Sequence, residues 1–118
     1  MATELLPLNK FLNVATKVTT TDQEVYEVGR SLSAIILNAV FVNYTTIDTN
    51  ASLILRKLNS DSSTTDYSLV PDMEIPANEV FTAVAGRMVL TQGDILIVRC
   101  SAIDRLDFIM SINEAANE

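Results

Sequence analysis

The chain contains no histidine, and this absence removes the most common chemistry of small enzymes. A Ser–His–Asp triad needs an imidazole to take the proton of the nucleophile. Zinc sites are built mainly from cysteine and histidine, and the chain has one cysteine, Cys100. A single cysteine also excludes an internal disulfide. We therefore expect no catalytic residue and no zinc, and we interpret Cys100 as a small buried apolar residue in a strand.

Clustered glycines, clustered basic residues and a calcium loop are also missing. The three glycines are dispersed, so no glycine-rich loop is present to hold a nucleotide phosphate. Eight basic residues against 15 acidic ones give a net charge of −7, which repels a nucleic-acid backbone. No Asp-x-Asp-x-Asp loop offers the oxygens that Ca²⁺ needs. We expect no metal, no cofactor and no nucleic-acid partner.

Long apolar runs are absent, although 48% of the residues are hydrophobic. A membrane-spanning helix needs roughly 20 apolar residues. The longest candidate, from Ala34 to Val42, is about half that length and is interrupted by Asn38. The first residues lack a basic segment followed by an apolar block, so we expect no cleaved signal peptide and no membrane partner. The hydrophobic content instead indicates surface that is buried in a core and against partners.

What the chain does contain is β-branched and apolar residues in short segments, separated by turns. We count about eight such segments with turns every ~8–14 residues and no convincing helix. This spacing predicts an all-β fold, a single antiparallel β-sandwich of jelly-roll or Greek-key type. We expect an extended N-terminal arm over residues 1–12, the sandwich over 13–113, and a flexible C-terminal tail over 114–118.

Two segments predict the positions of core strands. The segment "SLSAIILNAVFVN" (31–43) is apolar on both faces if it alternates strictly, which indicates an inner strand. Strict alternation would place Ile35, Leu37, Ala39 and Phe41 on one face and Ile36, Asn38, Val40 and Val42 on the other. The segment "RLDFIMSIN" (105–113) predicts a half-buried antiparallel strand. Its buried face would carry Leu106, Phe108, Met110 and Ile112, with Ile109 as an apolar exception on the opposite face.

Turn residues divide the second half of the chain. Gln92, Gly93 and Asp94 predict a chain reversal, because glycine adopts positive φ and aspartate bonds local backbone. We expect the flanking segments "RMVLT" and "ILIVRC" to pair as a hairpin. A polar loop is expected over residues 59–66 and a further turn near Pro71 and Asp72. Pro76 confines "MEI" to an edge or a strand end, since proline cannot donate to a ladder.

The order of these segments resembles the small β-sandwich virion proteins of tailed bacteriophages. The resemblance is carried by "VATKVTTTDQEVYEV", "AIILNAVFVN", "ASLILRKL", "MEIPANEVFTAV", "MVLTQGDILIV" and "LDFIMSIN". It covers most of residues 13–113, and its motifs are turns and strand ends. The matching positions are Ile75, Pro76 and Ala77, followed by Leu90, Gly93, Asp94, Ile95 and Val98.

This resemblance implies an assembly protein and transfers no catalytic residue. It implies a capsid decoration or cement protein, made in the host cytoplasm and located in the virion. Its partners would be the major capsid protein or other virion proteins, and it would form homo-oligomers, with trimers favoured. We expect the arm to act as an inter-subunit strap through Leu5, Leu6, Leu8, Phe11 and Leu12.

Two alternative functions stay open from the sequence. The same sandwich could serve as a neck, tail or baseplate accessory or adaptor protein. It could also be a carbohydrate-binding module, for which Tyr67 beside the polar loop is the one aromatic candidate.

Overall fold

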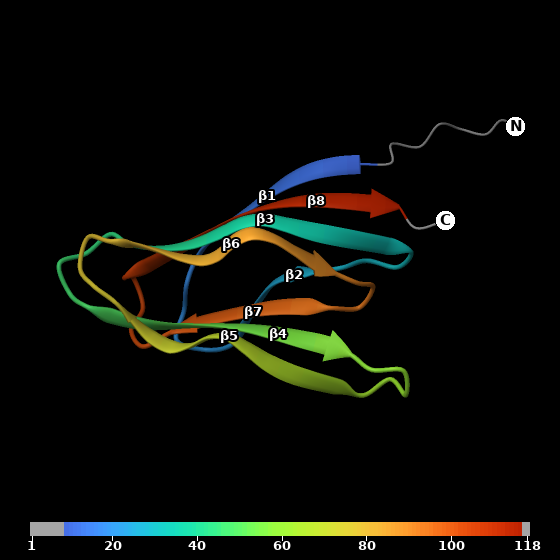
Figure 1. Ribbon diagram of the computed structural model, residues 1–118. Helices are drawn as coiled ribbons and strands as arrows, with labels where there is room; N and C mark the ends of the chain where they lie inside the picture. Colours follow the sequence, from blue (N-terminus) through green and yellow to red (C-terminus); the bar gives the residue numbers. More distant parts are fainter. Residues whose placement is uncertain (1–8, 117–118) are drawn as a thin grey trace, which may run out of the picture.

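The computed structural model describes residues 9–116, which form eight strands in two four-stranded antiparallel sheets. The sheets face each other as two layers (Figure 1), in the orders β1-β8-β3-β6 and β2-β7-β4-β5. This confirms the predicted antiparallel β-sandwich. The strands are β1 (Asn9–Lys17), β2 (Gln23–Glu27), β3 (Leu32–Asn43), β4 (Thr49–Leu58), β5 (Thr64–Ile75), β6 (Val80–Leu90), β7 (Ile95–Cys100) and β8 (Leu106–Ala116).

The strand pairing identifies the sandwich as a jelly roll. The first strand pairs with the last, β2 with β7, β3 with β6, and β4 with β5. This is the pattern of one long antiparallel ribbon wrapped across two layers. Of the two sandwich types left open by the sequence, the structure has the jelly roll. Every connection except β4–β5 therefore passes from one sheet to the other.

The predicted hairpin around Gly93 is wrong, although the predicted turn is present. β6 ends at Leu90 and β7 begins at Ile95, but the two strands lie in different sheets. Gly93 and Asp94 make the chain reverse, but they do not set the pairing of the strands on either side. β6 pairs with β3, and β7 pairs with β2 and β4. Gly93 has φ +87°, its N–H donates to the carbonyl of Val28 at 3.0 Å, and Val28 donates back to the Asp94 carbonyl at 2.9 Å. The turn is thus held against the end of β2.

The side chain of Asp94 holds the same turn from inside. Its carboxylate is buried and accepts hydrogen bonds from the backbone N–H of Thr91 at 2.9 Å and the Thr91 hydroxyl at 3.2 Å. Lys57 of β4 pairs with the same oxygen at 2.8 Å. The Gln92 side chain accepts from the N–H of Ser31 at 2.8 Å. A buried carboxylate needs such partners, and they tie the β6–β7 turn to β4 and to the β2–β3 loop.

The core fills the space between the two sheets. The rings of Phe41 and Phe108 meet at its centre, 5.1 Å apart and tilted by 52°. The four residues predicted for the buried face of β8 are all fully buried. Ile109 lies on the opposite face, as predicted. Other large buried side chains are Ile36, Leu53, Ile75, Leu90 and Leu96.

Strict alternation in β3 is a wrong prediction, because β3 contains a bulge. Ile36 pairs with Ile112 and Asn38 with the adjacent Ser111, so Leu37 is an extra residue without a partner on β8. A bulge of this kind shifts the side-chain alternation by one residue. The side of β3 that faces the core therefore carries Ala34, Ile36, Ala39, Phe41 and Asn43, and the side that faces away from it carries Ile35, Asn38, Val40 and Val42.

A second bulge replaces the turn predicted near Pro71 and Asp72. β5 runs without interruption from Thr64 to Ile75, and Asp72 takes positive φ, 52°, within it. The register with β4 shifts at this point. The polar loop expected over residues 59–66 is shorter than predicted, because β5 already begins at Thr64. Since β5 is the outermost strand of its sheet, the edge position inferred from Pro76 is confirmed.

Both ends of the sandwich extend further than the sequence predicted. β1 starts at Asn9, so Phe11 and Leu12 belong to a sheet strand rather than to a separate arm. β8 continues to Ala116, so most of the expected flexible tail is also strand. Leu5, Leu6 and Leu8 lie outside the described residues.

We expect Gly93→Ala to lower the free energy of unfolding by about 2–4 kcal/mol. A Cβ at this position would meet Leu58 Cδ2 at 2.5 Å, in addition to the strain of positive φ. Gly86→Ala is the matched control, because Gly86 also has positive φ but open space around it, and it should lose only about 1 kcal/mol. Urea denaturation measures both. Equal losses would contradict the close contact with Leu58.

We also expect stability to fall in alkaline solution because of Tyr26. Its hydroxyl donates to the Glu114 carboxylate across the two sheets, and burial, followed by this bond, raises the pKa of Tyr26 above its ordinary value. In the unfolded chain the phenol ionises at about pH 10. At the same pH the folded chain keeps the proton. The free energy of unfolding should therefore decrease as pH rises above about 10.

Tyr26→Phe should reduce the loss of unfolding free energy at alkaline pH, as measured by urea denaturation at a series of pH values. Tyr67→Phe makes the same change at an exposed side chain and is the control. An alkaline loss of the same size in wild type and Tyr26→Phe would contradict the assignment.

Candidate interaction surface

The outward side of the β1-β8-β3-β6 sheet is the surface that the fold leaves most apolar. We call it the outer face and define it by four rows of residues that the strand registers place side by side. Three rows are rich in apolar residues: Phe11–Asn113–Ile35–Val89, Ala15–Ile109–Val40–Thr82 and Lys17–Asp107–Val42–Val80. The fourth row, Asn13–Ser111–Asn38–Ala85, lies between the first two and is polar and uncharged. Directly opposed residues of antiparallel strands point to the same side, so each row crosses the whole sheet.

Several large apolar side chains of the outer face are exposed. Phe11 is 72% exposed, Val89 64%, Val80 60% and Ile109 38%. Single exposed apolar residues are ordinary on protein surfaces, whereas several on one sheet face indicate an interaction site. These four lie on three different strands of the same sheet.

The cross-strand rows of the outer face contain one ion pair. In the four rows only Lys17 and Asp107 are charged, and their Nζ and Oδ1 atoms pair at 2.8 Å. Arg87 of β6 is also exposed but has no partner on β3 and lies outside the rows. The hydrogen bond to Asp107 raises the pKa of Lys17, whose Nζ also lies 4.5 Å from the centre of the Tyr44 ring. A chain of net charge −7 thus has one sheet face whose rows contain no unpaired carboxylate.

The outward side of the other sheet is built differently. Two isoleucines of that side, Ile54 and Ile97, are buried at 9% and 1% exposure. Arg56 pairs with Asp66 at 2.8 Å and approaches Glu24 at 3.9 Å across the same surface. Further along, Arg99 pairs with Asp22 at 2.8 Å. The outward side of this sheet therefore presents charged side chains to water, whereas the outer face presents large apolar side chains.

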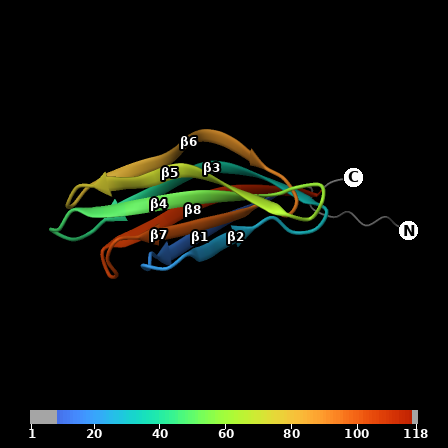
Figure 2. The same cartoon turned by 90° about the horizontal axis from the view of Figure 1, so that it is seen from below.

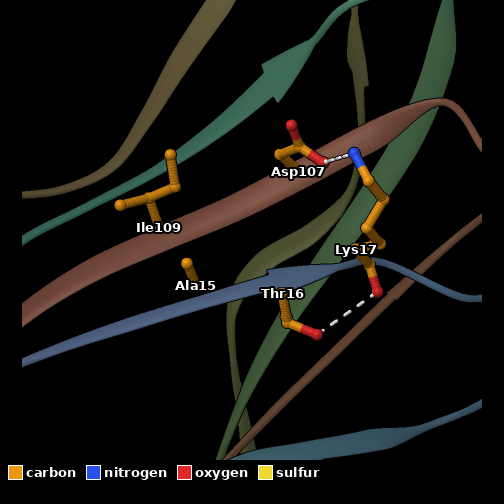
Figure 3. Close-up of a pocket in the computed structure, with 5 residues that line it drawn as sticks. All are labelled: Ala15, Thr16, Lys17, Asp107 and Ile109. Atoms are coloured by element: carbon orange, nitrogen blue, oxygen red, sulfur yellow. Dashed lines mark hydrogen bonds and ion pairs between the residues drawn. The ribbon is translucent and has the colours of Figure 1, made fainter.

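A small pocket of about 350 Å³ lies on the outer face between β1 and β8 (Figure 3). It is lined by Ala15, Thr16, Lys17, Asp107 and Ile109. Because Lys17 and Asp107 satisfy each other, the pocket offers apolar contact rather than a free acid or base. Its lining of five residues, with the one acid and the one base paired, can hold an apolar side chain of a partner protein.

The structure separates the residues predicted for the strap. Phe11 points outward on β1 and belongs to the outer face, while Leu12 packs toward the core. The predicted turn residues Gln92, Gly93 and Asp94 lie at the end of the sandwich where β8 finishes (Figure 1) and perform a structural role.

Val80 and Val89 were missed by sequence reasoning. β6 has two register shifts against β3, so its alternation cannot be followed in the sequence.

Other sequence expectations concern groups that carry chemistry. Cys100 is buried at 7% exposure in β7, as predicted, and burial raises the pKa of its thiol. Within residues 9–116, no group of three or more His, Cys, Asp or Glu side chains is placed to hold a metal ion. Over the same residues, no helix has the length and hydropathy to cross a membrane. Tyr67, the candidate for a sugar site, is exposed on β5.

Comparison with known proteins gives a likeness of fold. No family model matches the chain, and no curated protein matches its sequence. Among solved structures, it is similar to a chain of the T13 IBDV viral particle, with a TM-score of 0.54 and 8% sequence identity. The similarity covers 94% of this chain and 32% of the viral one, so this chain spans about a third of that protein's length. At this identity the likeness establishes a shared fold.

Neighbouring residues of β8 provide a test of the two faces. Met110→Ala empties a fully buried position and should cost about 2–5 kcal/mol of unfolding free energy. Ile109→Ala changes the outer face and should cost less than about 1 kcal/mol. Urea denaturation of both variants measures the difference. Similar losses would mean that Ile109 stabilises the isolated fold and is not available to a partner.

Proposed function

We propose that the chain is a virion structural protein, specifically a decoration or cement protein that binds across subunits of a capsid shell and performs no catalysis. The observation that carries this proposal is the group of exposed apolar side chains on the outer face of a jelly-roll sandwich, whose rows contain only one ion pair. Its partner in the proposal is the major capsid protein. The chain would act in the virion after synthesis in the host cytoplasm.

The physical mechanism is burial of the outer face against the shell. Each Å² of apolar surface removed from water contributes about 25 cal/mol before association costs. Lasting attachment needs an interface of roughly 1,000 Å² or more. The four rows cross four strands, and their one ion pair adds no repulsion to this burial. A shell held at subunit boundaries resists expansion, because separation would expose the buried surface again.

Two further observations support a virion role. The segments resemble small bacteriophage virion proteins, and the jelly roll is shared with a chain of a viral particle. Neither feature distinguishes a capsid site from a neck, tail or baseplate site. The outer face favours the capsid shell, because a broad sheet surface fits a broad partner surface.

The first residues extend the proposed contact. Leu5, Leu6 and Leu8 precede β1 directly, and Phe11 at the start of β1 belongs to the outer face. We propose that these side chains together form the strap to a neighbouring subunit. Leu12 is excluded from it, since it packs toward the core.

The number of copies in purified particles tests the site on the virion. Particles of the virus that encodes the chain are imaged by electron cryomicroscopy, and the chain is located in the density. Hundreds of copies on the shell are expected. Six or twelve copies at a neck or tail would replace the proposal by the adaptor function, and absence from the particle would overturn both.

We expect Val80→Glu with Val89→Glu to reduce binding to shells at least about tenfold, because both charges would be desolvated in the interface. Deletion of residues 1–8 should also reduce occupancy, through loss of the strap. Ser68→Glu adds a carboxylate to the charged side of the other sheet and should bind like wild type. Co-sedimentation with shells that lack the chain measures occupancy. Wild-type binding by the double variant would contradict the use of the outer face.

A further inference from the structure

One sheet edge of this sandwich differs from the other three. The edge strands are β1 and β6 in one sheet and β2 and β5 in the other, and Figure 2 shows β1 and β2 along one side of the molecule. Free edges invite pairing with another chain unless bulges, prolines or shortness prevent it. β2 has five residues and a register shift, β5 contains Pro71 and a bulge at Asp72, and β6 has two register shifts.

β1 has neither shortness, bulge nor proline to protect it, and its two lysines, Lys10 and Lys17, lie near its ends and leave the middle of the strand uncharged. It pairs with β8 in one unbroken register over nine residues, from Asn9 opposite Ala115 to Lys17 opposite Asp107. The strand contains neither proline nor glycine. It is therefore the one regular edge strand among residues 9–116.

The backbone groups on the free side of β1 can be identified. The N–H of Val18 donates to the carbonyl of Leu106 on the β8 side at 3.0 Å. In an antiparallel strand, alternate residues direct both backbone groups to the same neighbour. Even-numbered residues of β1 thus bond to β8, and the odd-numbered residues direct their N–H and C=O groups to the free edge: Asn9, Phe11, Asn13, Ala15 and Lys17. Among the described residues these groups have no backbone partner.

We propose that a second copy of this chain adds its β1 to this edge, antiparallel, about a two-fold axis at Asn13. Asn13 then lies opposite Asn13 of the second copy, and Phe11 lies opposite Ala15. Asn9 likewise lies opposite Lys17, so the register pairs all five free residues of each copy and forms ten backbone hydrogen bonds. A two-fold arrangement makes every contact twice, which is the commonest way in which identical chains associate.

The side chains of β1 fit this register. On the outer face the large Phe11 meets the small Ala15, and on the core side Leu12 meets Val14. Lys10 lies opposite Thr16, so no lysine faces a lysine. β1 also contains two lysines and no carboxylate, in a chain whose net charge is −7. Two copies of this acidic chain therefore meet less carboxylate repulsion at the β1 edge than at β2 or β5, both of which carry carboxylates.

The pairing has a structural consequence for the outer face. Joining two β1 strands makes one continuous eight-stranded sheet, with the outer faces of both copies on the same side. The apolar surface available to a shell doubles. The proposed dimer replaces, for the free chain, the trimer implied by the phage resemblance. It goes beyond the proposed function, because it does not require that the chain binds a virus particle.

A disulfide at the axis tests the register. Opposed residues of a hydrogen-bonded antiparallel pair have Cα atoms about 5.5 Å apart, within the range that a disulfide spans. The full chain with Asn13→Cys should form a covalent dimer under mild oxidation. Asn38→Cys places the same thiol on an inner strand of the same sheet and should stay monomeric on a denaturing gel. Wild type, with only the buried Cys100, gives the baseline. Equal cross-linking of the two variants, or none in Asn13→Cys, overturns the proposal.

Sedimentation velocity tests the association without cross-linking. Wild type is expected to be a dimer. Asn13→Lys should raise the dissociation constant of the dimer at least about tenfold, because the two added charges face each other at the axis. Ser68→Lys adds the same charge on β5 and should leave the dimer intact. A wild-type monomer at all concentrations, or a dimer unaffected by Asn13→Lys, overturns the proposal. Both results are independent of shell binding, so they distinguish failure of the dimer from failure of the cement function.

Discussion

The structure depends on one constraint: β3 is apolar on both sides, and only one side can lie between the sheets. The bulge at Leu37 decides which side that is, placing Ile36 and Phe41 in the core and Val40 on the outer face. The apolar residues on the other side of β3, Ile35, Val40 and Val42, are only half-buried. The remaining apolar residues of β3 therefore belong to a surface that the fold of one chain does not cover.

The two sheets treat their outward sides in different ways. On the β2-β7-β4-β5 sheet, Arg56 and its carboxylate partners lie beside isoleucines that are buried. In the rows of the outer face, the charges are limited to the Lys17–Asp107 pair, and Val80 and Val89 are in contact with water. The same chain thus contains one surface suited to solvent and one suited to another protein. This asymmetry is the physical basis of the proposed role in a shell.

Long-range pairing holds the two layers in register. Because β1 pairs with β8 and β2 with β7, the chain ends and the middle of the chain contribute to the same sheets. The turn at Gly93 lies where these layers meet, and Asp94 ties it to Lys57 of β4. A regular β1 edge remains after all these pairings are made. The outer face and the β1 edge are two distinct surfaces. In the two proposals, a capsid shell covers the outer face and a second copy of the chain pairs with the edge.

The sequence by itself determined the features that depend on neighbouring residues. Alternation placed Met110 inside and Ile109 outside, proline placed β5 at an edge, and glycine with aspartate predicted the reversal at 92–94. Only the tertiary structure decided which strands pair, where the bulge in β3 falls, and that Val80 and Val89 share a face with Phe11. The reason is physical: a turn or a period acts over a few residues, whereas pairing is a competition among strands far apart in the chain. A one-residue shift in that competition moves every following side chain to the opposite face.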